Sequence, residues 1–195
     1  MTLLGNLINK NATRARKIHN AVRIFAKRAF FGNDISADGM VLLSRNTRLA
    51  ILEGGTMRLG KNVTTDGRVS LYVGKDAHLM VGDSVYMNEN TMISCLGRVS
   101  IGEGTLIGPG VKVFDNDHMF GADGVALNCK AGEITIGRKC WLASNVVVLK
   151  NSHIGDHCVI GAGCVVKGDI PANTILKCRQ EQIQIPIDPQ RTENN

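Results

Sequence analysis

The chain has 195 residues, of which 44% are hydrophobic and 4% aromatic, and it contains 22 glycines. This suits one globular domain with an appendage, and because the apolar runs are short we expect neither a signal peptide nor a membrane-spanning segment. The net charge of +6 resides in residues 1–31, which contain seven Lys and Arg but no Asp or Glu. The remainder is nearly neutral, so we expect no nucleic-acid partner.

The first 32 residues are predicted to form a basic amphipathic helix. Apolar residues recur there at steps of three and four, and the basic residues fall between them. We favour a helix that packs on the body of the protein or on a neighbouring subunit. The alternative is association with a membrane surface through residues 1–31, which would hold the protein at the inner face of the membrane.

A weak repeat begins at residue 33. The pairs Leu59-Gly60, Val81-Gly82 and Ile101-Gly102 are spaced by 22 and 20 residues. Three hexapeptides make one coil of about 18 residues, so these spacings indicate small corner insertions. Residues 33–178 are therefore predicted to form one repeat domain, and residues 179–195 a C-terminal tail.

The repeat is interrupted after Val113. Ile136 follows 23 residues later, which leaves about five residues beyond one coil. The intervening segment is polar and contains glycines, so we interpret residues 114–134 as a corner loop. Loops on a rigid scaffold are favoured places for chemistry.

A period of six dominates the segment from Ile136 to Ala172. A helix would place apolar residues at steps of three and four, and a strand at every second position. A fixed period of six with glycines between the aliphatic residues is typical of hexapeptide repeats, which build an all-β, parallel β-helix with coils about 4.8 Å apart. The aliphatic positions are Ile136, Leu142, Val148, Ile154, Ile160 and Val166.

The six cysteines form no Cys-x-x-Cys pair, which argues against a zinc ribbon or a thioredoxin-like motif. Cys140, Cys158 and Cys164 each occupy the fifth place of a hexapeptide, the small slot that faces inward. We expect buried free thiols rather than nucleophiles. Free thiols and short apolar runs together predict a cytoplasmic protein.

Two polar residues are candidates for chemistry. His118 lies in the interruption, and a histidine near neutral pKa can take a proton from a hydroxyl or an amine. Asn88 lies between two repeat segments, and its amide can donate to a developing oxyanion. On sequence alone each is equally a surface or turn residue. Their 30-residue offset places them on different sides of one subunit, so they would converge only across a subunit groove or through a loop.

Three segments of the repeat body carry motifs of a known kind. Tyr86-Met87-Asn88-Glu89-Asn90 is followed some thirty residues later by His118 and a loop, residues 141–146 read WLASNV, and residues 160–171 read IGAGCVVKGDIP. They resemble the YxNxN segment, catalytic histidine, WIGxNV and IGAGSVVTKDIP segments of the hexapeptide-repeat acyltransferases. The closest branch is the galactoside, maltoside and surface-polysaccharide O-acetyltransferases.

The resemblance implies a left-handed parallel β-helix, an exception to the usual handedness of parallel crossovers. It implies a homotrimer with an active site in each groove between two subunits, and acetyl-CoA along that groove as co-substrate, with no metal. His118 would be the general base, and Asn88 would stabilise the oxyanion. Matching positions would contact CoA: Trp141, Ser144, Ala162 and Lys167.

The end of the body departs from the family pattern. After Ile175 the sequence LKCRQ replaces the usual ending that helps to bind the nucleotide of CoA. Lys177 and Arg179 are candidates to replace its contacts with the CoA phosphates.

The predicted reaction moves an acetyl group from acetyl-CoA to a hydroxyl of a sugar or glycan, in surface polysaccharide or glycan biosynthesis. Asp115 or Asp117 is a weaker candidate to orient the ring of the base, His118. One alternative is acetylation of an amine of a nucleotide sugar. Two others are a metal enzyme like the γ-class carbonic anhydrases, for which His153 and His157 would be candidate ligands, and a non-catalytic trimeric scaffold.

Overall fold

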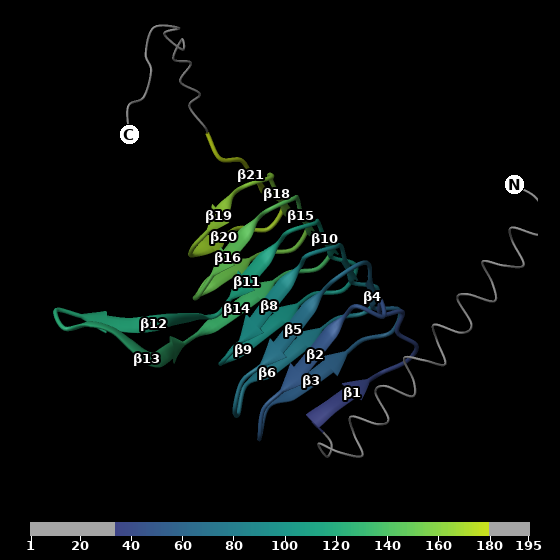
Figure 1. Cartoon of the computed structure of the whole chain (residues 1–195). Helices are drawn as coiled ribbons and strands as arrows, with labels where there is room; N and C mark the ends of the chain where they lie inside the picture. The colour runs from purple at the N-terminus through teal and green to yellow at the C-terminus, as the bar shows by residue number, and fades with distance from the viewer. Residues whose placement is uncertain (1–33, 180–195) are drawn as a thin grey trace, which may run out of the picture.

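Residues 34–179 are described by a computed structural model and form a parallel β-helix (Figure 1). The chain passes through three flat sheets in turn, so each coil adds one strand to each sheet. The fold class predicted from the period of six, an all-β parallel β-helix, is therefore confirmed. The predicted helix at residues 1–32 and all but the first residue of the predicted tail lie outside the described residues. Within residues 34–179, no helix is long and apolar enough to cross a membrane.

The described residues form seven strands in sheet A and six each in sheets B and C. Sheet A contains β1 (Ile35–Ala37), β3 (Thr56–Leu59), β6 (His78–Val81), β9 (Arg98–Ile101), β14 (Glu133–Ile136), β17 (Ser152–Ile154) and β20 (Asp169–Ile170). Sheet B contains β4 (Thr64–Thr65), β7 (Tyr86–Met87), β10 (Leu106–Ile107), β15 (Trp141–Leu142), β18 (Val159–Ile160) and β21 (Ile175–Leu176). Sheet C contains β2 (Arg48–Ile51), β5 (Ser70–Val73), β8 (Met92–Cys95), β11 (Lys112–Phe114), β16 (Val147–Leu149) and β19 (Val165–Val166).

The strand register confirms the coil alignment expected from the sequence. Leu59 pairs with Val81, and Val81 pairs with Ile101, at the predicted spacings of 22 and 20 residues. The last coil is shorter, because Ile154 pairs with Ile170 after only 16 residues. Coil length thus varies at the corners, while the strands keep their stacking.

Aliphatic side chains from equivalent positions stack along the axis and form the core. Successive side chains of a strand point to opposite faces, so one face of each sheet points inward. Burying one such side chain stabilises the fold by about 1.5–3 kcal/mol. In sheet C the fully buried row is Leu71, Ile93, Val113, Val148 and Val166.

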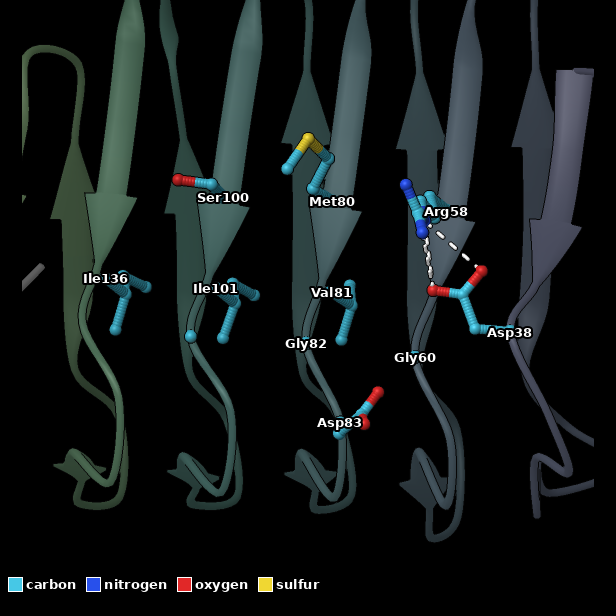
Figure 2. A pocket seen from close by; sticks show the side chains of 11 residues that line it. Asp38, Arg58, Gly60, Met80, Val81, Gly82, Asp83, Ser100, Ile101 and Ile136 are labelled. Atoms are coloured by element: carbon cyan, nitrogen blue, oxygen red, sulfur yellow. Dashed lines mark hydrogen bonds and ion pairs between the residues drawn. The ribbon is translucent and has the colours of Figure 1, made fainter.

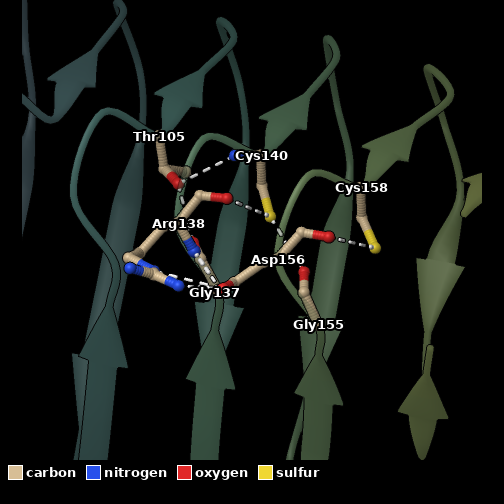
Figure 3. Close-up of polar contacts among 7 residues, drawn as sticks. All are labelled: Thr105, Gly137, Arg138, Cys140, Gly155, Asp156 and Cys158. Atoms are coloured by element: carbon tan, nitrogen blue, oxygen red, sulfur yellow. Dashed lines mark hydrogen bonds and ion pairs between the residues drawn. The ribbon is translucent and has the colours of Figure 1, made fainter. Parts of the chain in front are cut away.

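At several fifth places of the hexapeptides, a small residue donates a hydrogen bond from its side chain to the next coil (Figure 3). Cys140, Cys158 and Cys164 are buried there, so the prediction of inward-facing thiols is confirmed. Burial raises the pKa of the Cys140 thiol, which keeps this group protonated and able to donate. The bonds run from Thr105 Oγ1 to Gly137 O (2.8 Å), from Cys140 Sγ to Gly155 O (3.1 Å) and from Cys158 Sγ to Pro171 O (3.1 Å).

A β-hairpin leaves the body between sheets C and A, after β11 and before β14 (Figure 1). Its strands β12 (Asn116–Gly121) and β13 (Gly124–Ala131) pair antiparallel, and the hairpin projects away from the coils. We call residues 116–131 the arm. All but two of its side chains, those of Asn116 and Cys129, are exposed.

The insertion that forms the arm is larger than the sequence indicated. In the next coil, six residues separate Val148 from Ile154, whereas 23 separate Val113 from Ile136 at the equivalent positions. The insertion therefore adds 17 residues, and the expected excess of about five is wrong. The error arose because a whole coil was counted between two positions that lie on adjacent sides of the same coil.

Candidate active site

His118 lies on β12 of the arm and is exposed. Its Nδ1 is 3.2 Å from the carbonyl oxygen of Ala126 on the opposite strand. A carbonyl oxygen only accepts hydrogen bonds, so Nδ1 carries the proton in the neutral ring and Nε2 keeps its lone pair. The sulfur of Cys129, which pairs with His118 across the arm, lies 3.6 Å from Nδ1 and 4.0 Å from Nε2. In this tautomer, Nε2 is the ring nitrogen with a free lone pair.

Asp115 fastens the start of the arm to the coil below. Its carboxylate is fully buried and accepts hydrogen bonds from the backbone N–H groups of Leu96 and Gly97, both at 2.8 Å. The amide of Asn116 adds a bond to the carbonyl of Ser94 at 3.2 Å. Asp115 therefore does not orient the ring of His118, as the sequence had suggested, because its oxygens face a backbone turn.

Asp117 is also not a partner of His118. Its carboxylate pairs with the ammonium of Lys150 at 2.6 Å. The hydrogen bond from Lys150, with added attraction from Lys150 and Lys167, lowers the pKa of Asp117 below its ordinary value. The second carboxylate proposed as an orienting group thus joins the arm to the coil above.

Asn88 follows β7 at the corner between sheets B and C. Its Oδ1 accepts a hydrogen bond from the backbone N–H of Glu89 at 2.7 Å, which directs the NH2 group away from that bond. The left-handed turn residue of this motif is Asn90, with φ of 60°, rather than Asn88. Asn90, rather than Asn88, therefore has the left-handed backbone conformation expected of a turn asparagine.

Three of the four predicted CoA contacts lie along the edge between sheets B and C, and the fourth, Lys167, lies at the corner between sheets C and A. Trp141 is on β15 and half-exposed. Ser144 and Ala162 occupy equivalent corners of successive coils, where the Ser144 carbonyl accepts a hydrogen bond from Gly163 N at 2.9 Å. Lys167 follows β19 and lines a hollow with Asp117 and Lys150. This edge is also the one that bears Asn88.

The described chain does not bring His118 and Asn88 to the same corner. Asn88 stands where the chain turns from sheet B to sheet C, whereas the arm leaves where it turns from sheet C to sheet A. The residues expected to contact CoA share the corner of Asn88 or lie at the start of the arm. A complete site of the predicted kind thus needs a second copy of the chain.

The two histidines considered as metal ligands have structural surroundings. His153 Nδ1 lies 2.7 Å from the hydroxyl of Thr135, and His157 is a corner residue with φ of 59°. Across residues 34–179, no three His, Cys, Asp or Glu side chains cluster as a metal site would require. The geometry therefore does not favour the carbonic-anhydrase-like alternative.

A shallow groove lies on the outer face of sheet A (Figure 2). Arg58 and Asp38 form an ion pair of 2.9 Å at one end, and the half-exposed Met80 lies in the middle. None of the residues predicted to act in catalysis or CoA binding lines this groove. Its walls come from strand ends that stack for structural reasons, so we do not place the chemistry there.

Sequence reasoning missed three residues around His118: Ala126, Cys129 and Lys150. Ala126 acts through its carbonyl oxygen, which no side-chain pattern reports. Cys129 could be recognised as a cysteine outside the inward-facing fifth place of the hexapeptides. Lys150 lies two positions after the buried Val148, where the alternation of a strand predicts another inward-facing side chain. That break in the alternation was the available signal.

Comparisons with known proteins identify the family. Residues 133–168 match the bacterial transferase hexapeptide family (six repeats). The chain is 31% identical over 138 residues to WbbJ of Escherichia coli, and the match covers 65% of this chain and 69% of WbbJ. WbbJ is named, by inference, as a lipopolysaccharide biosynthesis O-acetyl transferase. The chain belongs to the bacterial hexapeptide-repeat transferase family. The prediction of an acyltransferase enzyme is thereby confirmed.

Other relatives of this hexapeptide-repeat transferase extend the comparison. Galactoside O-acetyltransferase of Escherichia coli is 34% identical over 62% of this chain and 61% of its own length. Among solved structures, AntD, an N-acyltransferase from Bacillus cereus, superposes with a TM-score of 0.61 at 18% identity over 80% of this chain and 90% of its own. The likeness to AntD shows a common fold.

Proposed function

We propose that the protein transfers an acetyl group from acetyl-CoA to a hydroxyl of a sugar, in the biosynthesis of a surface polysaccharide or another glycan. The relatives WbbJ and galactoside O-acetyltransferase, named as O-acetyl transferases, support the oxygen acceptor. Six cysteines without a disulfide support a reducing, cytoplasmic setting for the reaction.

The state of the His118 ring is the observation that carries the proposal. Because Ala126 O holds the proton-bearing Nδ1, the lone pair of Nε2 is available to an acceptor hydroxyl. The arm places this ring on an exposed surface that a sugar can reach.

The reaction proceeds by direct transfer. Nε2 of His118 takes the hydroxyl proton as the sugar oxygen attacks the thioester carbonyl carbon of acetyl-CoA. The resulting tetrahedral oxyanion accepts a hydrogen bond from the NH2 group of Asn88, whose Oδ1 is already held by Glu89 N. The carbon–sulfur bond then breaks, and the imidazolium returns its proton to the CoA thiolate. The products are the O-acetyl sugar and free CoA.

The proposal requires more than one copy of the chain, because one chain holds His118 and Asn88 at different corners, and we take the assembly to be a homotrimer. In a cyclic trimer, the arm of one copy would reach the edge of sheets B and C of the next copy. Trp141, Ser144 and Ala162 would line the CoA groove at that edge, and Lys167 would reach it from the corner at the start of the arm. Preorganised coils would hold the donor and the base in a fixed relation.

The first test is His118→Ala, assayed by CoA release from acetyl-CoA with a panel of sugars and nucleotide sugars. We expect kcat to fall by roughly 10²–10⁴-fold because the general base is lost. The matched control is His153→Ala, since His153 is also an exposed strand histidine but lies on β17 of sheet A. CoA release at the wild-type rate in His118→Ala would refute the mechanism. Acceptance of amino sugars alone would assign N-acetyl transfer instead.

A further inference from the structure

Lys150 lies directly after β16 and reaches the base of the arm. Only 15% of its side chain is exposed, compared with 56% for Asp117, its ion-pair partner. The ammonium lies 2.6 Å from Asp117 Oδ2 and donates a second bond to the backbone carbonyl of Lys130 at 3.4 Å. A lysine this buried has lost much of its hydration, so it depends on these partners.

The two contacts of Lys150 fall on both strands of the arm. Asp117 on β12 and Lys130 on β13 are opposite each other in the antiparallel register. The next pair along the arm is His118 and Cys129. The ammonium of Lys150 therefore bridges Asp117 and Lys130, the pair of residues next to the pair that contains His118.

Gly132 provides the space through which Lys150 reaches the arm. A Cβ on Gly132 would clash first with Oδ1 of Asn151 and then with Cγ of Lys150, from which it would lie 2.6 Å. Real Cβ atoms almost never approach other carbons this closely, so a side chain there would displace the lysine stem. Gly132 also donates its N–H to Asp115 O at 2.7 Å, which fixes its position beneath the stem.

We propose that Lys150 is a positioning residue for His118. Asp115 and Asn116 fix the arm to the coil below, and Lys150 fixes it to the coil above. Within the described part of the chain, no side-chain bond joins the coils to residues 119–128, the outer part of the arm. The lysine therefore sets the angle at which the arm carries its base to the acceptor. This proposal rests on the proposed function, in which His118 is that base.

The rival role is binding of a CoA phosphate, because Lys150 and Lys167 line the same hollow. Removing the negative charge of Asp117 has opposite expected effects for the two roles, so it distinguishes them. For an anion site, removing the carboxylate of Asp117 would strengthen CoA binding, since a repulsive charge is lost. For a positioning role, the same change would weaken catalysis, since the ammonium loses its hold on β12.

The kinetic test compares Lys150→Met, Asp117→Asn and the double variant in the full-length protein, with Lys75→Met, an exposed corner lysine, as the matched control. We expect each single change to lower kcat by roughly 10–100-fold through misplacement of the base. KM for acetyl-CoA should stay within about twofold, because the groove contacts are intact. The double variant should be no worse than the worse single one, since the two residues act as one unit. Lys150→Arg should recover part of the rate.

Hydrogen exchange of the amides of residues 117–130 gives a second readout that needs no activity. In Lys150→Met and Asp117→Asn we expect these amides to exchange several-fold faster, with no change in Lys75→Met. An unchanged kcat, multiplicative losses in the double variant, or a raised KM for acetyl-CoA with normal exchange would each overturn the proposal. If the wild type transfers no acetyl group, the proposed function fails, and exchange still decides whether Lys150 holds the arm.

Discussion

Cys95 is a buried thiol whose protonation is coupled to folding. Burial, and then the nearby Asp115 carboxylate, raises the pKa of Cys95 from an ordinary 9.0 to about 12. Because the pKa is raised in the folded state, the folded chain keeps a proton that the unfolded chain releases at alkaline pH. Its contribution to stability is therefore complete below pH 9 and is lost as the pH rises toward 12.

Cys95→Val should remove this dependence, and valine should fit because Val73 occupies the paired position of the coil below. Above pH 9, we expect the wild type to lose up to about 1.4 kcal/mol per pH unit more of its unfolding free energy than the variant. Urea unfolding at pH 8.5 and 10.5 measures the difference. Equal losses in both proteins would show that Cys95 stays protonated in the unfolded chain or titrates alike in both states.

At the scale of single residues, the sequence located the candidates better than their partners. The period of six showed which cysteines face inward, because a small slot recurs at a fixed place. Asp115 and Asp117, the weaker candidates to orient the ring of His118, have other partners that the sequence did not show. Asp115 instead continues the inward-facing alternation of β11, and Asp117 lies on a strand whose partner, Lys150, comes from the next coil.

The attachment of the arm to the coil below can be tested by mutation, because the buried carboxylate of Asp115 supplies two of its hydrogen bonds. Asp115→Ala would leave the N–H groups of Leu96 and Gly97 without an acceptor. An unsatisfied buried group costs about 1–3 kcal/mol, and because these two N–H groups are only partly buried we expect a loss of roughly 2 kcal/mol in unfolding free energy. The control is Asp123→Ala, at the exposed tip of the arm. A loss below about 1 kcal/mol in Asp115→Ala would mean that water replaces the carboxylate.

At the scale of elements, the regular coils could be predicted and the arm could not. Each coil repeats one physical solution, an aliphatic residue inward and a turn at the corner, so its period is visible in the letters. Strands β12 and β13 are exposed on nearly all sides and pair only with each other, so no burial pattern marks them. The sequence could show only that the period was broken there.

At the scale of the molecule, residues 34–179 leave apolar surface on the two features that a neighbouring copy would cover. On the arm, Phe120 is 83% exposed and Leu127 is 96% exposed. Along sheet B, the exposed fractions of Leu106, Trp141 and Ile175 are 49%, 52% and 64%. Surface of this kind on an arm and on a sheet face fits association between copies of the chain.

Mixing two inactive variants tests whether one site is shared between copies. His118→Ala and Asn88→Ala chains, unfolded together in equal amounts and refolded, would form mixed trimers. If His118 of one copy acts with Asn88 of the next, about a quarter of the sites would contain both intact residues by random assembly of a cyclic oligomer. CoA release should then recover to about that fraction of the wild-type rate. If each site instead lay within a single chain, every site in the mixture would carry one defect. A mixture no more active than its components would therefore place the whole reaction in one subunit.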